Sequence, residues 1–230
     1  MDRSLSRSRS FDPRRIIEGL RGLARSIAAS RWLRDSSYSF WIARYDRLSE
    51  RDRALIRERI ASFSDPPLFS VIVHHGGAPP GALPSSLESV FAQIYPHWEL
   101  ILCFDGSARP RVEEALGDRG KDPRVRQASC AQALEETKGG FVALLEASDE
   151  LSEHALYMIA EELQAHPESD LVYSDHDRID PRGRRCDPWF KSEWNPDLLL
   201  SQDCIGHLAV FRASVLAGLG AFRERCEGEG

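Results

Sequence analysis

Acidic side chains cluster where apolar runs of the sequence stop. Residues 141–145 read Phe-Val-Ala-Leu-Leu, a pattern typical of a buried strand, and Glu146 and Asp149 follow closely. Asp105 follows a second apolar run, residues 98–104, in the same way. Carboxylates at the end of a buried strand lie where open α/β folds place their ligands. These acids are therefore the first candidates for chemistry.

Strands and helices alternate along the main part of the sequence, and this order decides where the acids lie. The predicted strands are 68–73, 98–104, 124–128, 140–146 and 170–175, and the predicted helices are 83–93, 111–118, 131–137 and 151–166, the last capped by Ser152. Such an order is typical of an α/β fold with a mostly parallel sheet and helices on both faces. Ligands in these folds bind beyond the carboxyl ends of the strands. We therefore expect Asp105 and Asp149 at one edge of the sheet, with Asp175 ending a neighbouring strand in the same way.

Residues 1–65 precede this alternation and are interpreted as a basic, helical extension whose first residues are disordered. Residues 14–34 carry apolar residues at helical spacing with Arg between them. This pattern fits a helix packed on the main domain or a helix that rests on anionic lipid. Ser49 and Asp52 have the spacing of a capping box, which places a helix start near Ser49. Two prolines then mark the boundary with the main domain, residues 66–230.

The composition excludes some classes of function. A net charge of −6 argues against a nucleic-acid partner. The five cysteines form no Cys-x-x-Cys pair, which argues against a zinc site or a disulfide framework and suits a reducing compartment. No apolar run is long enough to span a bilayer. We expect a cytoplasmic protein, and residues 14–34 leave open a peripheral contact at the inner face of the membrane.

Three blocks of the sequence carry a family resemblance. They read SLESVFAQIYPHWELILCFDGS, GGFVALLEASDEL and HPESDLVYSDHDRIDPRGRRCDPWFKSEWNPDLLLSQDCIGHLAVFRASVL. Together with the opening strand PLFSVIV, they resemble the family 2 glycosyltransferases of the GT-A fold, particularly bacterial enzymes that assemble O-antigen and rhamnan-type polysaccharides. The resemblance runs from about Tyr38 to Gly228 and implies an incomplete GT-A domain over residues 66–230.

The resemblance implies roles for side chains at the sheet edge. Asp105 stands where the family binds the base of the nucleotide. His74 follows the first strand, where the family has other residues that contact the nucleotide. Glu146 and Asp149 stand at the metal and diphosphate site, which holds Mg²⁺ or Mn²⁺ in the family. The residues implied around the donor or acceptor sugar are Asp175, Asp177, Trp189, Lys191, Trp194 and His207.

The sequence departs from the family pattern at several of these places. Phe104 replaces the first Asp of an Asp-Asp-Gly-Ser turn. The metal motif reads Glu-Ala-Ser-Asp instead of Asp-x-Asp-Asp, and the neutral Ser148 weakens the expected metal site. The sequence ends at Gly230, where the family continues into the segment that holds the catalytic base. The base is therefore expected to be missing, with Glu229 only a weak stand-in.

The implied activity is transfer of a sugar, with inversion, from a UDP- or dTDP-linked donor to a polysaccharide or lipid-linked acceptor. Whether the chain is an enzyme stays open, because the metal motif is altered and the base is expected to be missing. The alternatives are a truncated relic that binds a nucleotide-sugar without turnover, or one part of a split enzyme. Simpler interpretations also stand: Asp105 as a turn residue, Glu146 and Asp149 as charges at a helix N-terminus, and Trp194 as packing.

Overall fold

The computed structural model describes residues 37–75, 81–104 and 108–219. The chain divides into two compact units, which are described separately. The first unit comprises residues 1–47 and 177–188, and the second comprises residues 48–176 and 189–230. The helix expected at residues 14–34, within the extension of residues 1–65, lies outside the described residues, and so do Asp105 and Glu229.

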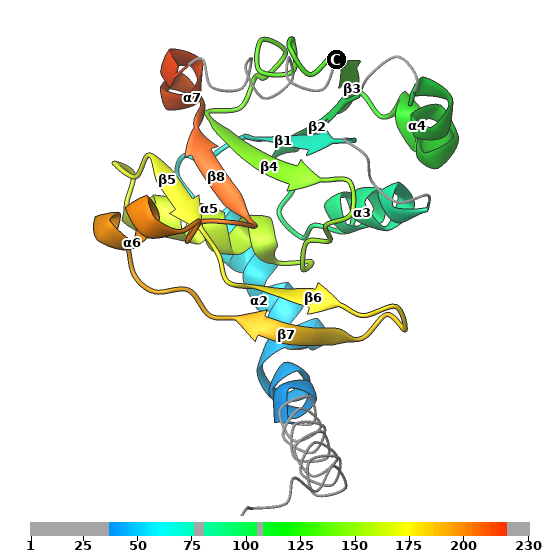
Figure 1. The fold of residues 1–230 in the computed structure, drawn as a ribbon. Coiled ribbons are helices and arrows are strands. Elements are labelled where there is room, and N and C mark those ends of the chain that lie inside the picture. Colours follow the sequence, from blue (N-terminus) through cyan, green and yellow to red (C-terminus); the bar gives the residue numbers. More distant parts are fainter. Residues whose placement is uncertain (1–36, 76–80, 105–107, 220–230) are drawn as a thin grey trace, which may run out of the picture. The chain divides into compact units, whose positions relative to one another are not determined.

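A six-stranded sheet forms the centre of the second unit (Figure 1). Its order is β3-β2-β1-β4-β8-β5. The strands are β1 (Phe69–His74), β2 (Trp98–Cys103), β3 (Val125–Ala128), β4 (Phe141–Glu146), β5 (Leu171–Tyr173) and β8 (Ala209–Arg212). Strands β1 to β4 are parallel, and β8 is antiparallel to both β4 and β5. The prediction of a mostly parallel sheet is confirmed, although the sequence analysis did not identify β8.

The sheet buries both faces, which explains the nearly unbroken apolar runs of its central strands. Val71 and Val73 of β1 enter one core together with residues of α2 (Glu50–Ala61), α3 (Ala82–Phe91), α4 (Arg109–Leu116) and α5 (Ala155–Ala165). Ile72 points to the other face and packs with Leu216 of α7 (Ala213–Leu219). The described part of this unit also contains two shorter helices, η2 (Gly117–Lys121) and α6 (Pro196–Ser201).

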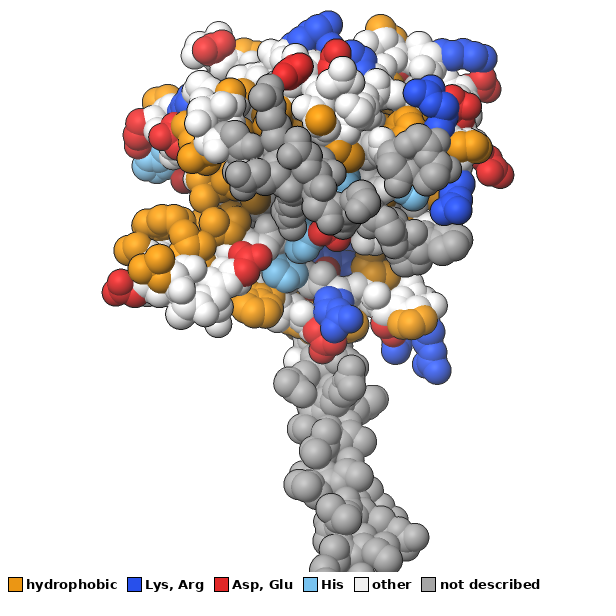
Figure 2. Space-filling model, turned by 45° about the horizontal axis from the view of Figure 1, so that its top comes forward, with side chains coloured by type: hydrophobic (Ala, Val, Ile, Leu, Met, Phe, Trp, Pro, Cys, Tyr) orange, Lys and Arg blue, Asp and Glu red, His pale blue; other side chains and the backbone are white. Residues whose placement is uncertain are grey.

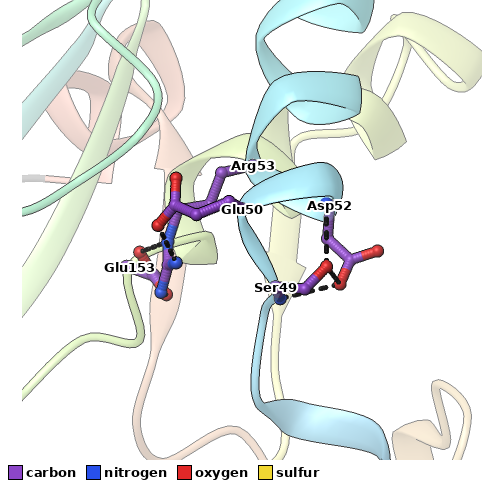
Figure 3. A network of polar contacts seen from close by, with 5 residues as sticks. All are labelled: Ser49, Glu50, Asp52, Arg53 and Glu153. Atoms are coloured by element: carbon purple, nitrogen blue, oxygen red, sulfur yellow. Dashed lines mark hydrogen bonds and ion pairs between the residues drawn. The ribbon is translucent and has the colours of Figure 1, made fainter.

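Helix α2 starts with the capping box that the sequence predicts (Figure 3). The Asp52 amide donates to Ser49 Oγ at 3.2 Å, and the Ser49 amide donates to the Asp52 carboxylate at 2.8 Å. One turn on, Arg53 forms an ion pair of 2.7 Å with Glu153, which precedes α5. The cap fixes where the helix begins, and the ion pair ties its first turn to the segment that follows β4.

The predicted helix at 131–137 is wrong. The segment forms successive turns, with amide-to-carbonyl bonds such as Gln132 to Ser129 and Glu135 to Gln132. Its end is drawn away from a helical path because the Lys138 amide donates to the Glu99 carboxylate at 2.6 Å. The Glu99 side chain of β2 therefore accepts the hydrogen bond that a backbone carbonyl would accept from the Lys138 amide in a continued helix.

The predicted cap of the helix after β4 is also wrong. Helix α5 begins at Ala155, with His154 as its N-cap and no side-chain cap hydrogen bond from it. The amide of Leu156 instead donates to Gln93 Oε1 at 3.0 Å, and Gln93 Nε2 donates to the Ser152 carbonyl at 2.7 Å. A side chain from the segment just after α3 satisfies the first turn, so Ser152 is not needed as a cap.

The first unit contains the π-helical turn η1 (Ile42–Asp46) and most of the two-stranded sheet of β6 (His176–Ile179) and β7 (Arg185–Trp189). Arg185 forms ion pairs with Asp46 and Asp177, the latter at 2.6 Å. Tyr38 donates its hydroxyl to Asp177 at 2.5 Å, and burial and this carboxylate raise the pKa of the phenol. Asp177 is therefore bonded within this unit.

None of the helices in the described part of the chain is long and apolar enough to cross a membrane.

Candidate functional site

The segment after β4 is held in place by its own turn and by α3. The Asp149 amide donates to the Glu146 carbonyl at 2.9 Å, and the Glu146 amide donates to Asp149 Oδ2 at 3.2 Å. The Leu151 amide donates to Ser89 Oγ of α3 at 3.0 Å. These bonds fix the carboxylate of Asp149 beside the end of the strand.

His207 contacts the Asp149 carboxylate from the segment that leads into β8. Strand β8 runs antiparallel to β4, so the segment that leads into β8 lies at the edge where β4 ends. His207 Nδ1 is 2.6 Å from Asp149 Oδ2. The sequence analysis placed Asp149 at the metal site and His207 at the sugar pocket, and the structure brings the two together.

The pKa of His207 is raised above its usual value. The main cause is its hydrogen bond to Asp149, and the charges of Asp149 and Glu146 act in the same direction. The protonated imidazole therefore stabilises the fold below the ordinary pKa, and this contribution is lost as the pH rises through the raised pKa. The two carboxylates at this edge therefore favour the protonated form of His207.

We predict that Asp149→Asn lowers the pKa of the His207 imidazole, because the ion pair is lost. The measurement is an NMR titration of the histidine ring signals, with His207→Gln used to assign the resonance. An unchanged titration curve for His207 in Asp149→Asn would show that the contact does not exist in solution.

The segment before His207 is shaped by Asp203 and Gly206. The Asp203 carboxylate accepts hydrogen bonds from the amides of Ile205 at 3.0 Å and Gly206 at 2.9 Å. Gly206 has φ of +48°, a conformation that favours glycine. The ammonium group of Lys191 donates to the carbonyls of Ile205 and His207, the latter at 2.6 Å. Lys191 thus braces the loop, and burial lowers the pKa of its side chain.

A hollow of about 210 Å³ opens beside His207. It is lined by His176, Trp189, Lys191, Asp203, Cys204, Gly206 and His207. The rings of His176 and Trp189 stack at 5.8 Å, and Trp189 remains 50% exposed. Figure 2 shows imidazoles and carboxylates lying close together near the middle of one face of the molecule. The hollow therefore combines an exposed aromatic face with charged groups.

The structure separates the other predicted site residues. Asp175 accepts a hydrogen bond of 2.7 Å from the Lys191 amide, which places it next to the braced loop. Trp194 is 55% exposed and does not line the hollow. Asp177 is bonded in the first unit, and Asp105 and Glu229 are outside the described residues. His74 ends β1, where its register partners are Cys103 and Glu146.

Sequence reasoning missed His176, Asp203 and Gly206. His176 directly follows Asp175, and its spacing alone does not distinguish it from a surface histidine. The Asp-Cys-Ile-Gly-His run at 203–207 did carry a signal, since an Asp three residues before a Gly is typical of a side-chain-stabilised turn.

Carboxylate oxygens at the end of β4 suit a divalent cation. Glu146 and Asp149 offer such oxygens, which Mg²⁺ and Mn²⁺ prefer. The imidazole of His207 is bonded to Asp149 at 2.6 Å, and this bond favours its protonated form, which cannot act as a metal ligand. Among the described residues, Glu146, Asp149 and His207 do not come together as a group of three potential ligands.

Comparison with known proteins gives consistent results. The model of the glycosyl transferase family 2 matches residues 70–220. An uncharacterized protein, y4gI, of Sinorhizobium fredii is 39% identical over 185 residues, which are 75% of this chain and 20% of that protein. The O-antigen biosynthesis protein RfbC of Myxococcus xanthus is 36% identical over 183 residues, 75% of this chain and 14% of RfbC. The chain therefore spans a fifth or less of these curated relatives.

A solved structure shares the fold. The crystal structure of residues 1–349 of TarS from S. aureus superposes with a TM-score of 0.52, at 19% identity, over 66% of this chain and 49% of that one. The mostly parallel sheet flanked by helices is thus a GT-A-like α/β fold. With the family match over residues 70–220, these findings show that the chain belongs to glycosyl transferase family 2.

Proposed function

We propose that this domain binds a nucleoside diphospho-sugar and transfers its sugar, with inversion, to a polysaccharide or lipid-linked acceptor. The observation that carries the proposal is the contact between Asp149 and His207 at the carboxyl end of β4, beside the hollow that Trp189 lines. Ligands of α/β folds bind at this end of the strands. The O-antigen biosynthesis protein RfbC among the relatives supports a polysaccharide as the class of acceptor.

The groups at the site match the parts of such a donor. The imidazolium of His207 places a positive charge where a leaving diphosphate needs one, and its pKa is raised by Asp149. The exposed ring of Trp189 offers an apolar face of the kind that packs on a sugar ring. Lys191 positions His207 by bonding its carbonyl at 2.6 Å. Asp105 remains our candidate for the base of a UDP- or dTDP-linked donor.

Glu146 and Asp149 would hold Mn²⁺ or Mg²⁺. Such an ion supplies charge neutralisation for a diphosphate when it is bound. The amphipathic pattern of residues 14–34 supports a place for the protein at the inner face of the cytoplasmic membrane.

The test is binding of UDP, dTDP and GDP to the 230-residue chain, measured by calorimetry and thermal shift with and without Mn²⁺. We expect UDP or dTDP to raise the melting temperature, because a ligand that binds only the folded state stabilises it. The absence of a shift with all three nucleotides at millimolar concentration would contradict the proposal.

A second measurement separates an active transferase from a domain that only binds. Release of the nucleoside diphosphate from UDP- and dTDP-sugars is followed over time, with an acceptor extract present or omitted. Turnover that depends on the acceptor supports transfer. Binding without any turnover would overturn the transferase activity and leave a nucleotide-sugar-binding module.

A further inference from the structure

The carboxyl ends of β1, β2 and β3 bring three metal-binding side chains to one face of the sheet. His74 and Cys103 are register partners on the parallel strands β1 and β2, so their side chains lie on the same face. Cys103 is in turn the partner of Ala128 of β3, and Cys130 lies two residues further along the chain. Cys103 and Cys130 pack in the core that lies on this face of the sheet.

The three side chains form a compact cluster. The ring nitrogen of His74 and the sulfur atoms of Cys103 and Cys130 all lie within 4.8 Å of one another. Cys103 is buried, whereas His74 and Cys130 are half-buried, so the cluster is open on one side. Within the stretches of chain that the structure describes, this is the one group of three such side chains found this close together.

We propose that His74, Cys103 and Cys130 bind a zinc ion. Zinc takes cysteine sulfur at about 2.3 Å and histidine nitrogen at about 2.0–2.1 Å in tetrahedral geometry, which sets the ligand atoms about 3.5–3.8 Å apart. In this structure the three ligand atoms lie within 4.8 Å of one another, a limit about 1 Å wider than the spacing in a zinc site. Small side-chain rotations close this difference. Three protein ligands leave the fourth position for water or another ligand, as in zinc sites that keep an open position.

This site differs in chemistry from the pair of carboxylates, Glu146 and Asp149, at the end of β4. Thiolates and imidazole select zinc over magnesium, whereas carboxylates favour magnesium or manganese. The proposal gives His74 a role other than the nucleotide contact that the family resemblance implies. It also does not depend on the proposed transferase activity, because its test measures metal and not sugar transfer.

The experiment measures zinc in the reduced, purified 230-residue chain. The metal is determined by mass spectrometry after dialysis, and affinity is determined by competition with a chromogenic chelator. Replacement of zinc by Co²⁺ adds a spectroscopic readout, since thiolate ligands give a charge-transfer band that carboxylates do not. We expect one zinc per chain and a cobalt spectrum with sulfur ligands.

The variant that tests the ligands is Cys130→Ser, because Cys130 is half-buried and the substitution is small. We expect at least about a tenfold loss of zinc affinity. Mutation of residues that merely hydrogen-bond to metal ligands already lowers metal affinity by about 10–100-fold. His74→Asn is expected to behave in the same way. The matched control is Cys186→Ser, another half-buried cysteine, in the other compact unit, whose loss should leave zinc binding unchanged.

Three results would overturn the proposal. The first is a reduced chain that binds no zinc although its circular dichroism shows it to be folded. The second is equal zinc affinity in the wild type, Cys130→Ser and His74→Asn. The third is a disulfide between Cys103 and Cys130 that persists under reducing conditions, which a peptide map would identify. A disulfide needs the sulfur atoms at about 2.05 Å and would leave no thiolates for a metal.

Discussion

The Asp149→Asn variant is expected to bind UDP or dTDP, with Mn²⁺ present, at least about 100-fold more weakly than the wild type, a loss of about 2.7 kcal/mol. The substitution keeps the shape of the side chain but removes its charge. It thereby removes one oxygen ligand for the cation and the partner that keeps His207 protonated. A weaker hold on the cation and a less protonated His207 both reduce the positive charge beside the bound diphosphate, so the two effects weaken binding together. Isothermal calorimetry measures the change directly.

A control variant lies one residue further along the chain. Glu150→Gln removes the same charge, but Glu150 is exposed. Its nucleotide affinity should stay within about twofold of the wild type, as expected for an exposed charge in high dielectric. Equal losses in Asp149→Asn and Glu150→Gln would show that only the overall charge matters and that Asp149 does not form the site.

The contribution of His207 is separated by a double-mutant cycle. If His207 acts only with Asp149, the double variant Asp149→Asn, His207→Gln should bind about as weakly as either single variant. Additive losses would mean that the two side chains contact the ligand independently.

The parts of the fold that local patterns control were predictable from the sequence. The runs that became β1, β2 and β4 are apolar and end at turn residues, and Ser49 and Asp52 form the expected capping box. The helix predicted at 151–166 contains α5, whose buried residues Leu156, Ile159, Ala160 and Leu163 recur at helical spacing. In each case, the residues that determine the structure are neighbours in the sequence.

The parts that failed depend on residues distant in the sequence. Gln93, which follows α3 and lies about 60 residues earlier in the chain, bonds the first turn of α5. The amide of Lys138, just after the turns at 131–137, bonds the Glu99 carboxylate. Strand β8 is short, and its four residues pair with strands on both sides, which a local pattern does not reveal. Tertiary contacts outweigh local propensity at these points.

The candidate site shows the same division. The acids at the end of β4 were identified, because a strand followed by acids is a local signal. The contact of His207 with Asp149 was not, because it joins residues 58 positions apart through the antiparallel pairing of β8 and β4. The scattered cysteines likewise argued against a zinc site, although the parallel register brings two of them to His74.

The opposite end of the sheet holds a buried polar network that fixes β1 against the start of β4. Glu99 is 6% exposed, and its carboxylate accepts hydrogen bonds of 2.6 Å from both Ser70 Oγ and the Lys138 amide. Arg126 supplies the opposing charge at 2.5 Å. The Gly139 amide donates to Ser70 Oγ at 2.9 Å, so the backbone at Gly139 is drawn directly onto β1. A buried charge that is paired in this way is costly to disturb.

Gly139→Ala is therefore expected to reduce the free energy of unfolding by about 3–5 kcal/mol, the range of severe core substitutions. A Cβ atom at this position would lie 2.5 Å from the Leu68 carbonyl oxygen and 2.7 Å from the Ser70 amide nitrogen. Both are backbone atoms, one in β1 and one in the residue before it. The clash is therefore relieved only if β1 and the segment before β4 move apart and the hydrogen bond from Gly139 to Ser70 breaks.

The neighbouring glycine supplies the control for this prediction. A Cβ atom at Gly140 would meet nothing within 4 Å, so Gly140→Ala should change stability by less than about 1 kcal/mol. Urea unfolding followed by tryptophan fluorescence compares both variants with the wild type. If Gly139→Ala is too unstable to purify while Gly140→Ala is recovered folded, the prediction still holds. Equal unfolding midpoints for the two variants would contradict the close approach of the backbone at Gly139, and with it the network that positions β4 and the acids at its far end.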